Sequence, residues 1–424
     1  MTTASLAERD YFTDHSVLLD PYEYFEAVRA RGPICWMEDR GYLLVTGFDE
    51  CVEVHRNSND FSALNALPSA TFPLPFTPTG SDISEQLEAH RHLYPGGDLV
   101  VSYDGKRHTD VRSLISRAFT PSRLKANEDF MKSYAAQLLS KAAEDGQCEL
   151  VKQIAEPFVT LVIADLQGVP SEDRVIFEKK IGEGNVAGSL DGPRGNENPT
   201  LEFIGRYMAQ YLQERAANPQ DDLLSELVTS TYPDGSKPEM AELVKLSTFL
   251  FAAGQDTSAK LIGNAMRYVV DVPGLQQQLR EDRELIPWMF EEVLRLEGST
   301  KVTSRIARRD TTIGGRKVAA GTEVVLSLAA ANRDPRRWGD DANEFKLKRR
   351  GVREHLAFGR GSHTCAGAPL ARREVIILLN SFFDHTSEIR ISEEHHGKQG
   401  ERRYQFEPSF ILRGLDNLHL ELRV

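Results

Sequence analysis

Residues 358–367 have the sequence FGRGSHTCAG, in which glycines lie on both sides of a single cysteine. A thiolate that binds iron must stay ionised and unoxidised while it donates electron density to the metal. Glycines around Cys365 allow backbone N–H groups to approach the sulfur, and such hydrogen bonds tune its electron donation. A helix that begins after Gly367 would favour the negative charge further. Taken alone, Cys365 would more often be an inert buried cysteine, so the prediction of an iron ligand depends on the whole pattern.

This segment resembles the cysteine-ligand loop of the cytochromes P450, and residues 368–374 (APLARRE) are similar to the helix that follows it in bacterial members. Four further segments match in the family's order and extend the resemblance over most of the chain. They are residues 107–112 (RHTDVR), similar to the C helix, residues 253–257 (AGQDT), similar to the oxygen-activation motif, residues 292–295 (EVLR), similar to the Glu-x-x-Arg of the K helix, and residues 332–335 (NRDP), similar to the meander.

The resemblance implies a haem b cofactor (iron protoporphyrin IX) with Cys365 as the axial ligand of the iron. It also implies that Phe358, Gly359 and Ala253 lie against the haem. The Glu292–Arg295 pair is structural in the family, where it ties the meander to the core. By itself it is a weak signal, because residues three apart on a helix can form a solvated surface pair of under ~1 kcal/mol.

The oxygen-activation motif implies a way to deliver protons to dioxygen. Ala253 and Gly254 leave room against the helix, and Thr257 can hydrogen-bond either to its own helix backbone or to the bound oxygen. Asp256 can relay protons through water. The alternative is that Thr257 hydrogen-bonds only to a backbone carbonyl within the helix and that Asp256 is a surface aspartate.

Four basic residues are expected to bind the haem propionates. His108 and Arg112 lie four apart on one face of a predicted helix. The resemblance adds Arg305, ten residues after Arg295, and His363 in the cysteine loop. Single basic residues usually face water, but together these four would neutralise two buried carboxylates.

The elements that must position these residues are mostly helical. Residues 239–270 have apolar residues at a helical period over a length that crosses a domain, and residues 282–296 form an amphipathic helix. Residues 40–48 predict a strand, and residues 311–328 and 408–424 predict further strands. We therefore expect a mainly α chain with a minor β region. The resemblance implies one cytochrome P450 domain over 1–424, triangular and helix-rich, with its β-rich part near the N-terminus and the haem between the long central helix and the cysteine-ligand loop.

Composition excludes several classes of protein. The net charge of −12 over 424 residues argues against nucleic-acid binding, which requires a basic surface. Four cysteines without paired spacing suit a reducing cytosol. The N-terminal residues lack a signal-peptide core, and no apolar run approaches the ~20 residues of a membrane span. We expect a cytoplasmic protein that is not bound to a membrane.

The resemblance implies a substrate pocket built from several segments. These include the loops 68–80 and 182–199 and the residues Phe249, Ala252, Val302, Thr303, Ile411 and Leu412. Most of these residues are apolar, which predicts a hydrophobic small molecule as substrate. Phe72, Leu74 and Phe76 of the first loop could equally be ordinary packing. Lys301 would meet a polar substrate group if it pointed inward, and otherwise would be a solvated lysine.

Electrons are expected from a separate ferredoxin and ferredoxin reductase, because the chain leaves no room for a flavin reductase domain. A basic patch on the thiolate side could steer an acidic ferredoxin, although some of its arginines could instead cap helices. Its expected members are Lys106, Arg107, Arg360, Arg372 and Arg373.

The sequence therefore predicts a monooxygenase that uses dioxygen to hydroxylate a hydrophobic compound. A peroxygenase that takes hydrogen peroxide directly is a second hypothesis, disfavoured by the Asp256–Thr257 pair. A non-catalytic haem protein that senses or carries a small ligand is a third. It would require neither the proton relay nor a large pocket.

Overall fold

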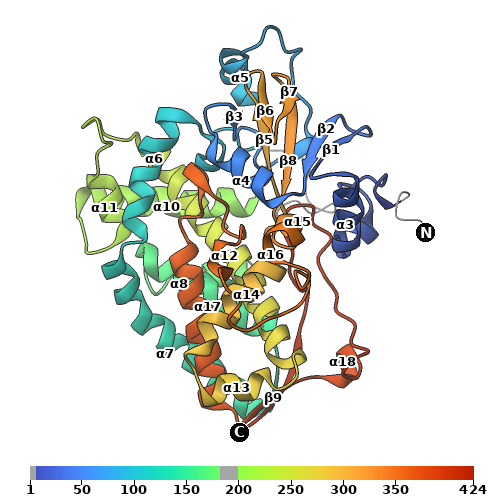
Figure 1. The fold of residues 1–424 in the computed structure, drawn as a ribbon. Coiled ribbons are helices and arrows are strands. Elements are labelled where there is room, and N and C mark those ends of the chain that lie inside the picture. The colour runs from blue at the N-terminus through green and yellow to red at the C-terminus, as the bar shows by residue number, and fades with distance from the viewer. Residues whose placement is uncertain (1–5, 182–198) are drawn as a thin grey trace.

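The computed structural model of the protein describes residues 6–181 and 199–424 (Figure 1). Helices form the larger part of the molecule, and the main sheet lies at its broad end, next to the N-terminal helices. The opposite end, where the C-terminus lies, is narrower. The prediction of a mainly α chain with a minor β region is confirmed. The loop expected at 182–199 lies outside the described residues except for its last residue.

Seven longer helices build the body. They are α6 (Gly105–Ala118), α7 (Pro121–Asp145), α8 (Glu156–Gln167), α10 (Pro199–Ala217), α12 (Met240–Asp271), α14 (Leu285–Glu297) and α17 (Ala368–His385). Shorter helices surround them. These are α2 (His15–Leu19), α3 (Tyr22–Arg31), α4 (Phe48–Arg56), α5 (Ser84–His90), α9 (Arg174–Ile181), α11 (Leu223–Thr229), α13 (Leu275–Glu281), α15 (Leu328–Ala331), α16 (Pro335–Trp338) and α18 (Glu393–His396).

The central helix α12 has 32 residues and packs against α8, α10, α14 and α17. At 1.5 Å per residue it is about 48 Å long, and the predicted range 239–270 matches it within one residue. Its apolar side, with Leu243, Leu250 and Leu261, is part of the largest hydrophobic core. No described helix is both long enough and apolar enough to span a membrane.

The helix expected at 282–296 begins three residues later, as α14. Asp282 adopts an extended conformation as the residue that ends α13, so it cannot also start the next helix. Both helices are amphipathic, which is why sequence periodicity alone placed the boundary too early.

The main sheet has five strands in the order β1-β2-β8-β5-β3. Their bounds are β1 (Ile34–Met37), β2 (Tyr42–Val45), β3 (Phe61–Ser62), β5 (Val302–Ala307) and β8 (Glu323–Ser327). Strand β2 pairs in parallel with β8, and the other neighbours are antiparallel. The strand predicted at 40–48 is β2, and the segment 311–328 contains a hairpin and then β8.

The other strands form two small sheets. One has the order β4 (Gln147–Glu149), β10 (His419–Arg423), β9 (Glu388–Ile391), and the other is the hairpin of β6 (Thr311–Ile313) and β7 (Arg316–Val318). Of the strands predicted at 408–424 only β10 forms a ladder. The preceding residues pair through isolated bridges, such as that of Leu412 with Thr300.

The pair Glu292–Arg295 lies in the interior, and both side chains are fully buried. Arg295 donates to both carboxylate oxygens of Glu292, at 2.9 and 2.7 Å. It also donates to the carbonyl oxygens of Asn332 and Ala342, at 2.9 and 2.6 Å. Arg349 donates to Glu292 from the same segment, at 2.9 Å. The interpretation as a solvated surface pair is therefore wrong, and this pair joins α14 to residues 332–349.

We predict that Arg295→Met destabilises the protein by roughly 3–5 kcal/mol, because it leaves a buried carboxylate and several carbonyl groups without their main donor. Lys125→Met is the matched control, since Lys125 and Glu128 form an ion pair of the same i,i+3 spacing at 2.7 Å with the lysine exposed. It should leave the free energy of unfolding almost unchanged, because solvent screens an exposed pair. Denaturant unfolding followed by circular dichroism measures both, and equal losses would contradict the structural role of Arg295.

Candidate functional site

The cysteine loop follows a path that two glycines determine. The N–H of Cys365 donates to the carbonyl oxygen of Phe358 at 2.8 Å and closes the loop. Gly359 and Gly361 have φ angles of +66° and +73°, where other residues are strained. At Gly361 a Cβ atom would also lie 2.2 Å from the carbonyl oxygen of His55. A side chain at Gly361 would therefore displace the loop.

The sulfur of Cys365 lies at the start of α17. Its side chain is accessible to water, whereas the other three cysteines are buried. Protein atoms still surround it, and this desolvation raises the pKa of the thiol. Hydrogen bonds from the N–H groups of Gly367 and Ala368 and the charge of Arg112 act in the opposite direction and favour the thiolate. The backbone donors expected from the glycine pattern are thus present at the sulfur.

Glu291 of α14 connects the segments on the two sides of this loop. One of its oxygens lies 3.0 Å from His355 Nε2, before the loop, and the carboxylate accepts two hydrogen bonds from Arg372 of α17, after it. Burial would raise the pKa of Glu291, but these two partners outweigh it and lower the pKa to about 2. The ionised carboxylate therefore holds both ends of the cysteine loop to α14.

The middle of α12 contains an accessible stretch within an otherwise buried helix. Ala253 is exposed, while Phe251 and Ser258 on either side are buried. The hydroxyl of Thr257 donates to the carbonyl oxygen of Ala253 at 2.9 Å. Because α12 packs against α17, this stretch and the Cys365 sulfur belong to neighbouring elements. The bond of Thr257 to its own helix is one of the two states expected from the sequence.

Asp256 is only partly exposed and is held by an ion pair. Lys260, one turn along α12, forms hydrogen-bonded ion pairs with Asp256 and with Glu407, the latter at 2.7 Å. The Lys260 side chain is 5 % exposed and passes so close to Gly414 that a Cβ there would lie 2.1 Å from its Cγ. Asp256 is therefore not a freely solvated surface residue. Sequence reasoning missed Lys260, although its i,i+4 spacing from Asp256 is visible; nothing in the sequence pointed to Glu407.

The four predicted propionate ligands come together from three parts of the chain. His108 and Arg112 lie on α6, Arg305 on β5 and His363 in the cysteine loop. The rings of His108 and His363 are 4.0 Å apart, and Arg112 donates to the carbonyl oxygen of Thr364. His55 of α4 is a fifth member, which sequence reasoning missed. We call these five residues the basic cluster.

Three members of the basic cluster, His55, His108 and Arg305, are buried, whereas Arg112 and His363 are partly exposed. Arg305 is 5 % exposed, donates to Ser304 O at 2.6 Å and forms no ion pair with any described carboxylate; Arg112 forms none either. Burial lowers the pKa of Arg305 to about 10. Burial and the neighbouring cations lower the pKa of His363 to about 2 and that of His55 to about 3. Buried cations without counter-charges are costly, so the cluster is suited to a ligand with two carboxylates.

A haem fits both features of this site. Among residues 6–181 and 199–424 no group of three or more His, Cys, Asp or Glu side chains is arranged to hold a metal ion. Cys365 is suited to a metal ion whose remaining ligands belong to a cofactor. A porphyrin supplies four nitrogen ligands and two propionates, which match the single thiol and the basic cluster. Phe358, whose ring lies under the guanidinium of Arg372 at 4.8 Å, and Gly359 flank the sulfur in the loop.

The predicted substrate residues fall into two groups. The segments 299–303 and 409–413 lie side by side, joined by hydrogen bonds from Lys301 N to Ile411 O at 2.7 Å and from Arg413 N to Ser299 O at 2.8 Å. Phe249, Ala252, Thr303 and Ile411 are partly exposed, whereas Val302 and Leu412 are buried at 1 % and 4 %. The four partly exposed residues remain available to a ligand, whereas Val302 and Leu412 are part of the protein interior.

The loop 68–80 and Lys301, which were also expected near the substrate, pack against other parts of the protein. Phe72, Leu74 and Phe76 lie against a small core that contains Tyr94 and Ile306. Lys301 is 1 % exposed and its Nζ donates to the carbonyl oxygen of Leu18 at 2.9 Å, while burial shifts its pKa well below the ordinary value. The interpretation of Lys301 as a solvated lysine is wrong, because the N-terminal segment covers it.

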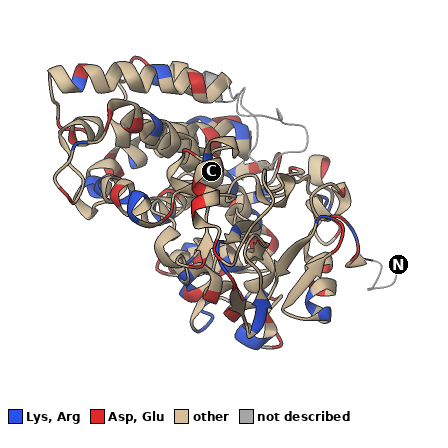
Figure 2. Cartoon of the chain, turned by 90° about the horizontal axis from the view of Figure 1, so that it is seen from above, with Lys and Arg blue, Asp and Glu red and all other residues tan. Residues whose placement is uncertain are grey.

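The basic residues expected on the thiolate side are largely neutralised. Lys106 pairs with Asp110 and Asp234, Arg372 with Glu291, and Arg373 with Glu128. Arg360 donates to the carbonyl oxygen of Glu354 at 2.6 Å. Figure 2 shows basic and acidic residues interspersed over the helices. Attraction of an acidic partner by these five residues is therefore weaker than a count of charges suggests.

Comparisons with known proteins agree with this geometry. The family model described as cytochrome P450 matches residues 199–387. The putative cytochrome P450 YjiB of Bacillus subtilis is 30% identical over 382 residues, which cover 88% of this chain and 89% of that protein.

Two solved structures are similar over nearly the whole chain. Substrate-free cytochrome P450 CYP150A6 of Mycobacterium marinum has 43% sequence identity and a TM-score of 0.92, with 98% of this chain and 99% of that chain covered. CYP109E1 of Bacillus megaterium, in complex with corticosterone, has 26% identity and a TM-score of 0.79, with 96% and 100% covered.

We predict that Arg305→Leu changes the haem-free and haem-loaded forms in opposite directions. The haem-free protein becomes more stable, because an unpaired buried charge is removed. The loaded protein releases haem about tenfold faster or more, because a hydrogen bond to a charged group contributes about 1.5–3 kcal/mol. Thermal unfolding and transfer of haem to an excess of apomyoglobin measure the two effects.

Arg309→Leu is the control, since Arg309 is exposed and pairs with Asp82 at 3.1 Å on the other side of the same segment. It should change neither quantity appreciably. Haem release from Arg305→Leu at the wild-type rate would show that Arg305 does not bind the cofactor.

Proposed function

The chain belongs to the cytochrome P450 family, whose members are monooxygenases, and on this premise we propose that it uses dioxygen to hydroxylate a mainly hydrophobic small molecule. Haem-thiolate oxygenation is general to the family. One observation supports the proposal most strongly. An accessible cysteine, whose thiolate the backbone N–H groups of Gly367 and Ala368 favour, occurs in the same site as a basic cluster whose two arginines pair with no described carboxylate.

We assign Cys365 as the iron ligand and His108, Arg112, Arg305 and His363 as the propionate ligands. Phe358, Gly359 and Ala253 border the cofactor in this assignment. When bound, haem supplies the binding and reductive activation of dioxygen. The protein holds the cofactor, excludes water from it and delivers protons to it.

Proton delivery is assigned to Thr257 and Asp256. The Thr257 hydroxyl, which donates to Ala253 O, can rotate and donate its proton toward the accessible side of α12 instead. Asp256 replaces that proton through water. Lys260 acts as a positioning residue, because its ion pair with Asp256 and Glu407 limits where the carboxylate can move. Proton transfer from Asp256 thus requires this ion pair to loosen.

The substrate is proposed to be apolar. Phe249, Ala252 and Ile411 offer partly exposed hydrophobic surface, and Thr303 adds one hydroxyl. Lys301, which precedes Val302 and Thr303 in this region, donates to Leu18 O and does not offer its charge to a substrate. The complex of CYP109E1 with corticosterone shows that a relative of this fold accepts a steroid, so steroids and similar polycyclic compounds are suitable first ligands.

Electrons are proposed to come from a separate ferredoxin and its reductase. Bacterial members of the family typically depend on separate redox partners. These partners would meet a single domain: we propose that residues 1–424 form one domain, because α12 packs against helices from both halves of the chain. Since most of the expected basic patch is already paired, docking would depend on shape as well as charge.

Turnover experiments separate the three hypotheses. With NADPH, ferredoxin, reductase and ¹⁸O₂, a monooxygenase places one labelled atom in the product and the other in water. Product formation from hydrogen peroxide alone, with none from the electron-transfer system, would indicate a peroxygenase. Ligand binding without product under either condition, across substrates that shift the spectrum, would indicate a sensor or carrier.

We predict that Thr257→Ala uncouples electron use from product formation. The variant should fold normally, because alanine has high helix propensity, but most electrons should appear as hydrogen peroxide, with product per NADPH reduced several-fold. Thr248→Ala is a matched control, since Thr248 also lies on α12 and donates to the carbonyl oxygen four residues before it, at 2.7 Å. Peroxide and product are quantified together. Full coupling in Thr257→Ala would remove Thr257 from the mechanism.

A further inference from the structure

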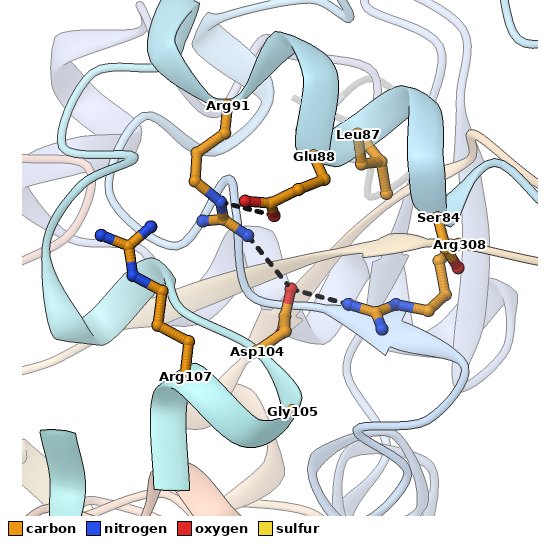
Figure 3. A pocket seen from close by; sticks show the side chains of 8 residues that line it. All are labelled: Ser84, Leu87, Glu88, Arg91, Asp104, Gly105, Arg107 and Arg308. Carbon is orange, nitrogen blue, oxygen red and sulfur yellow. Dashed lines mark hydrogen bonds and ion pairs between the residues drawn. The ribbon is translucent and has the colours of Figure 1, made fainter. Parts of the chain in front are cut away.

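A cavity lies outside the cysteine loop and the basic cluster, between α5, the start of α6 and the segment that follows β5 (Figure 3). Its volume is about 220 Å³, which is sufficient for a small polar group. Three arginines line it: Arg91 follows α5, Arg107 lies in the first turn of α6, and Arg308 follows β5. Figure 3 shows their guanidinium groups around one space.

Asp104, at the base of this cavity, is already saturated with donors. Its carboxylate accepts from Ser62 Oγ at 2.5 Å, from Ala63 N at 3.0 Å and from Arg308 at 2.7 Å. Arg91 lies farther away, with its Nη2 at 3.9 Å. Because its carboxylate already interacts with Ser62, the N–H of Ala63, Arg308 and Arg91, Asp104 cannot neutralise all three arginines.

Several donors of the arginines have no acceptor among the described residues. The Nε of Arg308 is buried and makes no hydrogen bond. Arg107 uses only Nη2, which donates to Tyr103 Oη at 2.9 Å and lies 3.8 Å from Glu242 outside the cavity lining. Its guanidinium stacks on the Tyr103 ring at 3.9 Å, which fixes its plane. A preorganised planar donor group with free N–H bonds suits an oxyanion.

The residues that line the cavity carry one more positive than negative charge, and Glu242 lies 3.8 Å from Arg107 outside the lining. Three guanidinium groups face two lining carboxylates, and one of these, Glu88, has a side chain that is 61 % exposed and thus well screened. The N-terminus of α6 adds partial positive charge at Gly105, which also lines the cavity, and no side chain caps it. An anion in the cavity would therefore meet both free donors and a favourable potential.

We propose that this cavity binds the phosphate or carboxylate group of a small molecule, with Arg107 and Arg308 as its main ligands. Arg91 supports the site: it donates to Gly97 O at 3.0 Å and Ser102 O at 2.8 Å and so holds the loop that joins α5 to α6. A bound anion would connect that loop to the segment after β5. This site is independent of the proposed monooxygenase chemistry.

The test uses the haem-loaded protein and inorganic phosphate as the probe. Calorimetric titration and thermal unfolding are measured in phosphate and in sodium chloride of equal ionic strength. We expect saturable binding and a rise of Tm in phosphate alone. Arg107→Gln, an exposed position at which folding is not at risk, should weaken phosphate binding about tenfold or more.

Lys106→Gln is the matched control. Lys106 is the neighbouring cation on α6, pairs with Asp110 and Asp234 and does not line the cavity. It should retain phosphate affinity within about twofold. Arg308→Lys, which keeps the charge beside Asp104 but removes the buried Nε donor, should also weaken binding.

Two outcomes overturn the proposal: no saturable phosphate effect in the wild-type protein, or equal losses in Arg107→Gln and Lys106→Gln, which would indicate general charge screening. A parallel titration with acetate distinguishes the two sources of the anion. Tighter binding of phosphate supports a phosphate monoester as the ligand, and tighter binding of acetate supports a carboxylate. Because the readout is binding, its failure would leave the monooxygenase proposal unaffected.

Discussion

The acidic pair Glu291 and Glu292 on α14 holds the cysteine loop in place, and the site depends on it. Glu292 binds Arg295 and Arg349 and so attaches residues 332–349 to the helix. From that segment Asn332 Oδ1 accepts the N–H of Leu356 at 2.7 Å, two residues before the loop. Glu291 completes the attachment through His355 and Arg372. Both carboxylates are buried and paired, so loss of their basic partners would leave a buried negative charge uncompensated.

The basic cluster, in contrast, contains charged residues without acidic partners. His55, His108, His363, Arg112 and Arg305 converge in the interior, and no described acid pairs with either arginine. Because buried charges are costly without a counter-charge, a cluster of this kind suits a ligand that supplies one. The contrast between the two sets of buried charges supports an anionic cofactor beside Cys365. It also explains why the cysteine loop, α4, α6 and β5 meet there.

Much of this arrangement could be predicted from the sequence. The loop at 358–367 and the AGQDT segment could be identified because they resemble continuous motifs of the cytochrome P450 family, and the periodicity of residues 239–270 located α12 within one residue. Contacts set by distant segments were not predictable. Lys301 is covered by Leu18, far away in the chain, and His55 joins the basic cluster from α4 through tertiary packing alone. Lys260 could be predicted only in part: its i,i+4 spacing from Asp256 is visible in the sequence, but its burial beside Gly414 is not.

The most direct test of the central claim is the absorption spectrum of the purified protein, reduced with dithionite and exposed to carbon monoxide. The account predicts a strongly red-shifted Soret band, characteristic of a thiolate ligand, which Cys365→Ser abolishes and Cys148→Ser preserves. A spectrum typical of histidine-ligated haem, a red-shifted band that persists in Cys365→Ser, or failure to bind haem would contradict the assignment of Cys365 as the iron ligand.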